Sequence, residues 1–188
     1  MNFMCRQSVK VTLIGVLFPL IFIGISEARL KVEAVKDVDL NRYAGTWYEI
    51  ARLPNKHEKG MVEATLTLNK GADGRYTLVT TGYKGSPGGK RTMVKGDVSI
   101  PDPKNTGDLK VKVLFFNVGY KIIDLDKENY RYALVTSDSD KFLWIFSRSP
   151  VLEEDAFQRM VESARQKGFA VDNLEMVRQE ANRAFAER

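Results

Sequence analysis

The stretch Gly45-Thr46-Trp47-Tyr48-Glu49-Ile50 opens the first aromatic-rich segment of the chain. A glycine turn that leads into an ordinary β-strand would explain this stretch taken alone. A second stretch, Leu143-Trp144-Ile145-Phe146-Ser147-Arg148, closes the last strand-like segment before a segment with helical periodicity. The two stretches therefore bound a long run of strand-like sequence that starts with a glycine–tryptophan pair and ends with an arginine.

Eight segments in this part of the chain have the composition or the alternation of β-strands. The clearest is Val62-Glu63-Ala64-Thr65-Leu66-Thr67-Leu68, where apolar and polar residues alternate with the period of a strand. Glycine, proline, asparagine and aspartate separate the segments and predict turns. The expected strands are residues 46–52, 62–68, 75–83, 92–100, 109–116, 120–126, 130–136 and 141–148.

Consecutive strands joined mostly by short turns predict an antiparallel meander. An open meander would leave two unpaired edges, and closure into an up-and-down barrel would remove them. An eight-stranded barrel leaves room for one small ligand. A β-sandwich with a filled core would show the same alternation, so periodicity alone leaves both architectures open.

One helix is expected after the strands. Ser149 is the predicted N-cap, Pro150 lies in the first turn, and residues 153–155 place negative charge where the helix dipole favours it. Phe157, Met160, Val161 and Ala164 form an apolar stripe, and Gly168 suits the position after the helix. Leu174-Glu175-Met176-Val177 then predicts a short ninth strand.

This arrangement resembles the lipocalin family, in particular its bacterial branch, which is similar to apolipoprotein D and the plant temperature-induced lipocalins. The resemblance implies an all-β fold: an eight-stranded antiparallel up-and-down barrel, with one C-terminal α-helix packed outside and a short ninth strand beside the first. It also implies structural roles for Gly45, Trp47 and Arg148. Trp47 is expected to plug the closed end of the barrel, and Arg148 to pack across its indole ring.

Strand parity extends this expectation to the barrel interior. If Trp47 points inward, Glu49 and Ala51 should do so too, and Phe146 should share the face of Trp144. The resulting pocket would be apolar and aromatic and would suit an acyl chain, at roughly 0.8 kcal/mol for each buried methylene. For each residue, a place in a filled core remains the alternative. The ligand-lining candidates are Leu66, Leu78, Val94, Val113, Phe115, Tyr120, Ile122, Val135, Phe142 and Trp144. Loop residues expected to meet a polar head group at the open end are His57, Lys84, Arg91 and Asn117.

The function that the resemblance implies is binding of fatty acids or lysophospholipids, in cell-envelope lipid storage, repair or transport. Two alternatives stay open: a packed barrel that serves as a protein-interaction module, and a carrier of another hydrophobic molecule such as a tetrapyrrole or a retinoid. Catalysis is not expected, because the sequence lacks a nucleophile motif, a phosphate-binding loop and metal-ligand spacing. No cofactor is expected either.

The first 28 residues have the layout of a secretory signal peptide. Arg6 and Lys10 precede an apolar run over residues 11–25, which is short for a membrane span. Retention as an anchor is the alternative to cleavage after Ala28. The only cysteine, Cys5, precedes the apolar run, unlike the lipid-attachment cysteine of many bacterial lipocalins. We expect an exported protein, periplasmic or secreted, with contact to the outer membrane as a further expectation. The lipocalin domain is expected over residues 29–178, and a polar tail over residues 179–188.

The whole chain carries 29 basic and 24 acidic residues, a net charge of +5. Cleavage would remove two basic residues and one acidic residue and leave a net charge of +4. This excess would favour peripheral contact with anionic lipid head groups, although a solvated surface explains it equally. The basic and aromatic residues do not form a stacking platform, so nucleic-acid binding is not expected. A homodimer is a further expectation from the resemblance.

Overall fold

The computed structural model describes residues 32–180. The expected signal peptide lies outside the described residues, as does most of the expected tail. The strands are β1 (Gly45–Arg52), β2 (Met61–Lys70), β3 (Tyr76–Lys84), β4 (Lys90–Ser99), β5 (Asp108–Val113), β6 (Phe116–Leu125), β7 (Tyr132–Thr136), β8 (Leu143–Ser147) and β9 (Glu175–Met176). The helices are α1 (Leu40–Tyr43), α2 (Glu154–Gln166) and the 3₁₀ turn η1 (Val171–Asn173).

The first eight strands form a closed antiparallel barrel. Each strand from β2 to β8 pairs with the next, β8 pairs with β1, and β1 pairs with β2, where Gly45 lies opposite Leu68 and Tyr48 opposite Thr65. This last pairing closes the sheet on itself, so the predicted barrel is confirmed and the sandwich is excluded. β9 pairs with β1 outside the closed ring, as predicted.

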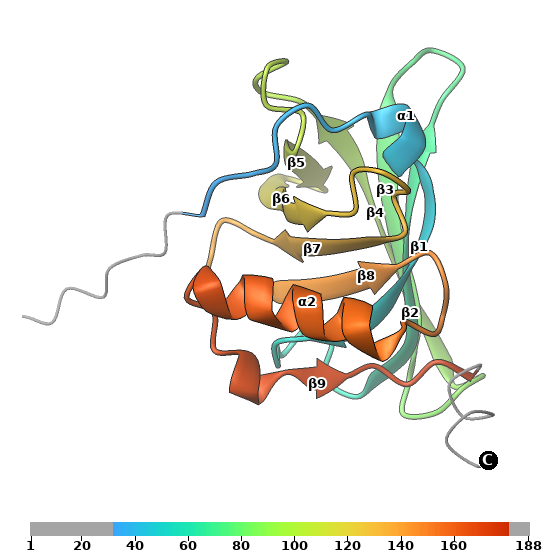
Figure 1. Ribbon diagram of the computed structural model, residues 1–188. Coiled ribbons are helices and arrows are strands. Elements are labelled where there is room, and N and C mark those ends of the chain that lie inside the picture. The colour runs from blue at the N-terminus through green and yellow to red at the C-terminus, as the bar shows by residue number, and fades with distance from the viewer. Residues whose placement is uncertain (1–31, 181–188) are drawn as a thin grey trace, which may run out of the picture.

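The core has two layers, separated by the barrel wall. The inner layer fills the barrel and includes Trp47, Leu66, Tyr120 and Phe146. The outer layer lies between the wall and α2, which runs along the outside of β7 and β8 in Figure 1. Apolar residues of β1, β7 and β8 therefore serve both layers, because successive strand residues point to opposite faces.

Helix α2 begins later than predicted, at Glu154 instead of next to Ser149. The hydroxyl of Ser149 accepts a hydrogen bond from the backbone N–H of Val151 at 3.3 Å, and Ser147 accepts one from the N–H of Ser149 at 3.1 Å. These local turns use the serines before the helix starts. The predicted end is confirmed, with Gly168 at φ +88° and the N–H of Phe169 bonded to the carbonyl of Ala164.

The barrel has a closed end and an open end. Helix α1 covers the closed end, where Figure 1 shows it at the top of the barrel. The side chain of its N-cap, Asp39, accepts hydrogen bonds from the N–H groups of Asn41 and Arg42. The opposite, open end is bounded by the connections at residues 53–60, 85–89, 114–115 and 137–142.

The hairpin between β5 and β6 differs from the prediction. A fifth strand to residue 116 and a turn at residues 117–119 were expected, but Val113 pairs with Phe116, and Leu114 and Phe115 form the turn. Leu114 has φ +53°, a conformation that usually favours glycine or asparagine. Gly119, which suggested the turn, instead lies where a Cβ atom would overlap the carboxylate of Asp138.

The C-terminal segment fills a gap between β1 and β2. These strands pair only as far as Tyr48 and Thr65, and beyond that point residues 177–179 lie between them. Val177 donates its N–H to the carbonyl of Ile50, and the buried amide of Gln179 donates to the carbonyls of Glu49 and Ala64 at 2.9 and 3.0 Å. The ordered domain thus includes Gln179. Among the described residues, no helix combines the length and the apolar character needed to cross a bilayer.

Candidate ligand-binding site

The closed end is built around Trp47, which is fully buried. The guanidinium carbon of Arg148 lies 3.8 Å from the centroid of its ring system. Gly45 precedes this pair with φ +98°, and a Cβ atom there would lie 3.2 Å from Nη1 of Arg148. The predicted positions of all three residues are confirmed, and the geometry explains the glycine: the turn needs its φ, and the arginine needs its space.

Arg148 also ties the closed end together through hydrogen bonds. Its Nη2 donates to the carbonyls of Arg42, Tyr43 and Ala44 at 2.8–3.0 Å, and its Nη1 donates to the carbonyl of Thr46 at 3.0 Å. The carbonyls of Arg42, Tyr43 and Ala44 lie at the C-terminal end of α1, where free acceptors need a donor, and that of Thr46 lies in β1. The indole Nε1 of Trp47 donates to the carbonyl of Tyr43 at 2.8 Å.

Two tyrosines form the floor of the interior. The hydroxyls of Tyr43 and Tyr120 are 2.7 Å apart and both side chains are buried. Burial raises the pKa of both phenols, because an ionised phenolate would lose its hydration. The pair therefore stays neutral, and one hydroxyl donates a hydrogen bond to the other within an otherwise apolar floor. Sequence reasoning placed Tyr120 inside but missed Tyr43.

Most of the predicted ligand-lining residues face the interior. Trp144 and Val113 are partly buried against the inner layer, and Phe142 stacks on Trp144 with ring centroids 5.8 Å apart. The fully buried members of the inner layer are Leu66, Leu78, Tyr120, Ile122 and Val135. Their positions are confirmed, and their role in holding a ligand stays a prediction.

Two candidates differ in exposure from the rest. Val94 lies opposite Thr80, which lies opposite Leu66, so it shares the inner face, yet its exposed fraction is 44%. Phe115 was predicted to point inward, but it lies in the β5–β6 turn and is 91% exposed. That position is wrong because β5 ends at Val113, three residues earlier than predicted.

A β-bulge in β1 changes which side chains enter the interior. Glu49 lies opposite Phe146, and the next pair is Ala51 with Ile145, so Ile50 is the extra residue. Beyond the bulge the parity is reversed, and Arg52 lies opposite Trp144. Glu49 points inward as predicted. Ala51 does not, because the bulge turns it into the outer layer.

The bulge places an ion pair inside the barrel. Nη1 of Arg52 lies 2.8 Å from a carboxylate oxygen of Glu49, and their side chains are 4% and 1% exposed. Burial raises the pKa of Glu49 to about 8, the nearby charge of Glu58 adds to this rise, and Arg52 opposes it. Nη2 of Arg52 donates to the carbonyls of Glu58 and Met61, but its buried Nε has no partner among the described residues.

The loop over residues 53–60 is tied to the same place. The indole Nε1 of Trp144 donates to Oε2 of Glu58 at 2.9 Å, and the amide of Asn55 donates to the same oxygen at 2.6 Å. Together with the bond from Arg52 to the carbonyl of Glu58, these contacts hold the loop beside the mouth of the barrel. Sequence reasoning missed Arg52 and Glu58, since charged residues next to a loop carry no signal of inward direction.

The inner face of β6 becomes exposed towards the open end of the barrel. Ile122 and Tyr120 are 0% and 7% exposed, whereas Val118 and Phe116, further along the same inner face, are 46% and 72% exposed. The apolar face is therefore continuous from the buried floor to the solvent. The four predicted head-group residues, His57, Lys84, Arg91 and Asn117, are all exposed and belong to the open end.

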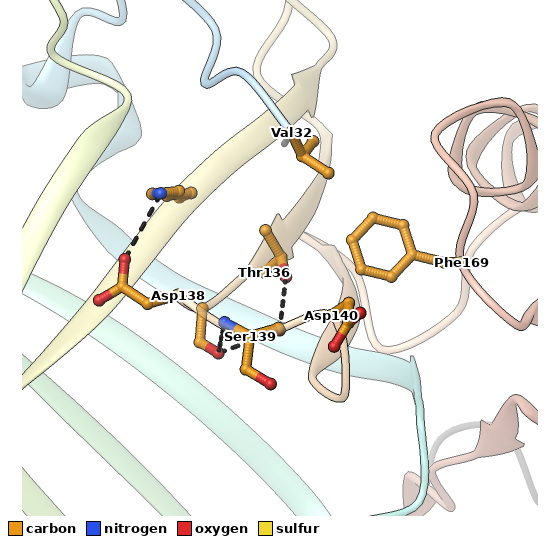
Figure 2. A pocket seen from close by; sticks show the side chains of 8 residues that line it. Val32, Thr136, Asp138, Ser139, Asp140 and Phe169 are labelled. Atoms are coloured by element: carbon orange, nitrogen blue, oxygen red, sulfur yellow. Dashed lines mark hydrogen bonds and ion pairs between the residues drawn. The ribbon is translucent and has the colours of Figure 1, made fainter. Parts of the chain in front are cut away.

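A separate small pocket lies outside the barrel wall. Figure 2 shows Val32 and Phe169 beside Thr136 and the turn that contains Asp138, Ser139 and Asp140. Its volume is about 30 Å³, room for about one water molecule. Within residues 32–180 no cluster of histidine, cysteine and acidic residues could hold a metal ion. Neither feature competes with the barrel interior as a ligand site.

Comparison with known proteins agrees with this geometry. Residues 38–179 match the family described as Lipocalin-like domain. The outer membrane lipoprotein Blc of Escherichia coli (strain K12) is 35% identical over 149 residues, covering 79% of this chain and 83% of that protein. Temperature-induced lipocalin-1 of Arabidopsis thaliana is 30% identical over 155 residues, covering 77% and 81%. The structure of insecticyanin from the tobacco hornworm Manduca sexta superposes with a TM-score of 0.64 at 21% identity, covering 80% of this chain and 86% of that one.

Proposed function

Since this chain belongs to the lipocalin family, we propose that it binds fatty acids or lysophospholipids in its barrel and carries them within a cell envelope. The observation that supports the proposal most is the inner face of β6, which stays apolar from the buried floor at Ile122 to the exposed rim at Phe116. A barrel interior lined in this way would suit a molecule with a long apolar part and one polar end. The polar end would remain near the open end, beside the exposed basic residues.

The proposed role is that of a carrier and not of a catalyst. The single histidine, His57, is exposed in the loop between β1 and β2, and Cys5 would leave with the signal peptide. Glu49, the carboxyl group whose pKa is strongly raised, is in contact with Arg52. We propose export to the periplasm or the exterior, since the relatives include proteins named as outer membrane lipoproteins. A homodimer is compatible with this role.

Two neighbouring residues of β4 offer a matched test. Val94 is on the inner face at the open end, and Met93 is on the outer face next to it, and both are exposed. Val94→Trp should fill the entrance without opening the buried core, and Met93→Trp should add the same bulk outside. We expect Val94→Trp to weaken binding of a fatty acid or lysophospholipid by at least about tenfold, and Met93→Trp to leave it unchanged.

Native mass spectrometry of the exported protein gives the direct measurement, followed by organic extraction of whatever accompanies it. Co-purification or uptake of one fatty acid or lysophospholipid per chain supports the proposal. A mass that stays that of the bare protein after incubation with both lipid classes contradicts it, and favours a barrel that acts only as an interaction module. A bound tetrapyrrole or retinoid would contradict the proposed ligand class and identify the protein as a carrier of another hydrophobic molecule.

A further inference from the structure

Exposed apolar side chains gather at one place on the molecule. Among the described residues, seven large apolar side chains are strongly exposed, and six of them lie on β4 and on the β5–β6 hairpin. The remaining one, Met176, is in β9. A monomeric protein in water rarely keeps such a concentration of apolar surface without a partner. We use the name apolar lip for Val94, Leu114, Phe115, Phe116 and Val118.

The apolar lip exists because neighbouring strands end at different heights. β4 pairs with β5 only from Asp97 to Ser99, so residues 90–96 of β4 have no paired partner in β5. On the other side, β7 ends at Thr136, so β6 between Phe116 and Tyr120 has no β7 partner. The short hairpin therefore stands between two strand edges, with its turn residues directed into solvent.

A groove of about 500 Å³ lies beside the hairpin turn and is lined by Lys95, Gly96, Asp97, Lys112 and Leu114. Gly96 allows the close approach of the two strands here, since a Cβ atom would lie 2.5 Å from Val111 and 2.9 Å from the carbonyl of Lys112. The groove thus joins the apolar turn to two exposed ammonium groups.

The charge around the apolar lip is positive. Between Lys84 and Gly96 the chain contains four basic residues and no acidic residue. Lys56 and Lys59 of the loop over residues 53–60 are exposed at the same end of the barrel. The nearby acid Asp138 is already paired with Lys110 at 2.7 Å, which leaves Asp97 as the acid of the groove. Apolar side chains surrounded by basic residues are suited to a bilayer with anionic head groups. The basic residues favour approach to the bilayer, and the apolar side chains favour insertion into it.

We propose that the apolar lip docks onto an anionic lipid bilayer and lets an acyl chain pass into the barrel without crossing water. Val94, Phe116 and Val118 belong to the inner face of the barrel wall and are at the same time part of the exposed lip. A chain that leaves the bilayer there meets apolar surface continuously down to Ile122. The inference of docking is based only on the exposed apolar side chains of the lip and the basic residues around it. The inference that an acyl chain passes into the barrel rests on the proposed function.

Vesicle flotation with the exported protein tests the docking. The vesicles are phosphatidylcholine with and without phosphatidylglycerol. The test variant is Leu114→Asn with Phe115→Ser, since asparagine tolerates the positive φ at residue 114 and neither side chain is buried. The control is Met176→Ser, which removes an exposed apolar side chain elsewhere. We expect the wild type to bind vesicles that contain phosphatidylglycerol, the double variant to bind at least about tenfold more weakly, and the control to bind as the wild type does.

A second variant tests the charge. Lys95→Glu with Lys112→Glu should weaken binding to the anionic vesicles by at least about tenfold and leave binding to pure phosphatidylcholine nearly unchanged. The proposal is overturned if the wild type does not bind anionic vesicles, or if the lip variant and the Met176 control bind alike. It is also overturned if the wild type is a dimer without vesicles and the lip variant is a monomer while no form binds vesicles, because the lip would then join two copies.

Transfer of a fluorescent fatty acid from the same vesicles separates the two proposals. Binding to vesicles without any uptake would leave the docking in place and contradict lipid carriage. Uptake of dissolved fatty acid by a lip variant that no longer binds vesicles, together with slowed uptake from vesicles, supports both.

Discussion

The carboxylate of Glu49 and the guanidinium of Arg52 lie 2.8 Å apart inside the barrel, although residues three apart in a regular strand face opposite sides. The bulge at Ile50 makes the pair possible. Burial removes water from both side chains, and because it raises the pKa of Glu49 despite the nearby Arg52, the protonated carboxyl is the form that folding favours. The protonation of Glu49 therefore affects the stability of the folded barrel.

The pKa of Glu49 predicts how stability changes with pH. Folding raises this pKa from 4.5 to about 8, so the folded state holds the proton more tightly than the unfolded chain. The stabilisation that protonated Glu49 adds to the free energy of unfolding is fully present below pH 4.5 and is lost as the pH rises through 8. Across this window the free energy of unfolding should fall by up to about 1.4 kcal/mol per pH unit. Glu49→Gln should remove that fall, as measured by urea unfolding from pH 5 to 8. Equal slopes for the two proteins would contradict the assignment.

The contact between Trp144 and Glu58 predicts the behaviour of the loop over residues 53–60. Glu58→Ala removes the acceptor of the indole N–H. The free energy that opposes local opening of the loop should therefore fall by about 1–2 kcal/mol. Hydrogen exchange of residues 55–60 should become faster, and the emission of Trp144 should move to longer wavelength as water reaches the ring. Lys59→Ala, in the same loop but exposed, is the control. Unchanged exchange in the Glu58 variant would show that Arg52 alone holds the loop.

The closed end could be predicted from the sequence, whereas the mouth of the barrel could not. Gly45, Trp47 and Arg148 were predicted together through the family resemblance, and their distances confirm it. The alternation of apolar residues predicted the strands because it follows directly from the two faces of a sheet. Both signals describe regular structure.

The features of the mouth arise from departures from regularity. The bulge at Ile50 leaves no mark in the composition of β1, and it moves Ala51 out and Arg52 in. The turn at Leu114 and Phe115 contains neither glycine nor asparagine, so the sequence favoured the later turn at Asn117 and Gly119. In both cases tertiary packing decided the conformation against local preference.

Among conservative substitutions, we expect that of Arg148 to lower the free energy of unfolding most. Arg148→Lys keeps the charge but cannot stack on the Trp47 ring and bond four carbonyls at once. We expect a loss of about 2–4 kcal/mol in the free energy of unfolding, measured with urea. Arg131→Lys, whose side chain is 58% exposed with a single ion pair, should cost less than about 0.5 kcal/mol. Equal losses would mean that the stack and the carbonyl bonds add little.

Trp47→Ala tests the plug of the closed end. Removal of a fully buried indole should cost roughly 3–5 kcal/mol and leave Arg148 without its stacking partner. Because the two residues touch, Trp47→Ala combined with Arg148→Lys should cost less than the sum of the two single losses. A double variant whose loss equals that sum would show that the residues act independently, whatever the distance between them.

Gly45 gives a separate test of why the Gly-x-Trp pattern needs its glycine. Gly45→Ala must adopt φ near +98° and place its Cβ atom 3.2 Å from Nη1 of Arg148. Gly60→Ala must also adopt a positive φ, +69°, but its Cβ atom would have no neighbour within 4 Å. We expect losses of about 1–3 kcal/mol at residue 45 and about 1 kcal/mol at residue 60, measured by thermal unfolding. The contribution of the arginine is tested by Gly45→Ala in the Arg148→Lys background. If the contact matters, the cost of the alanine should there fall towards that at residue 60, and an unchanged cost would assign the glycine to backbone conformation alone.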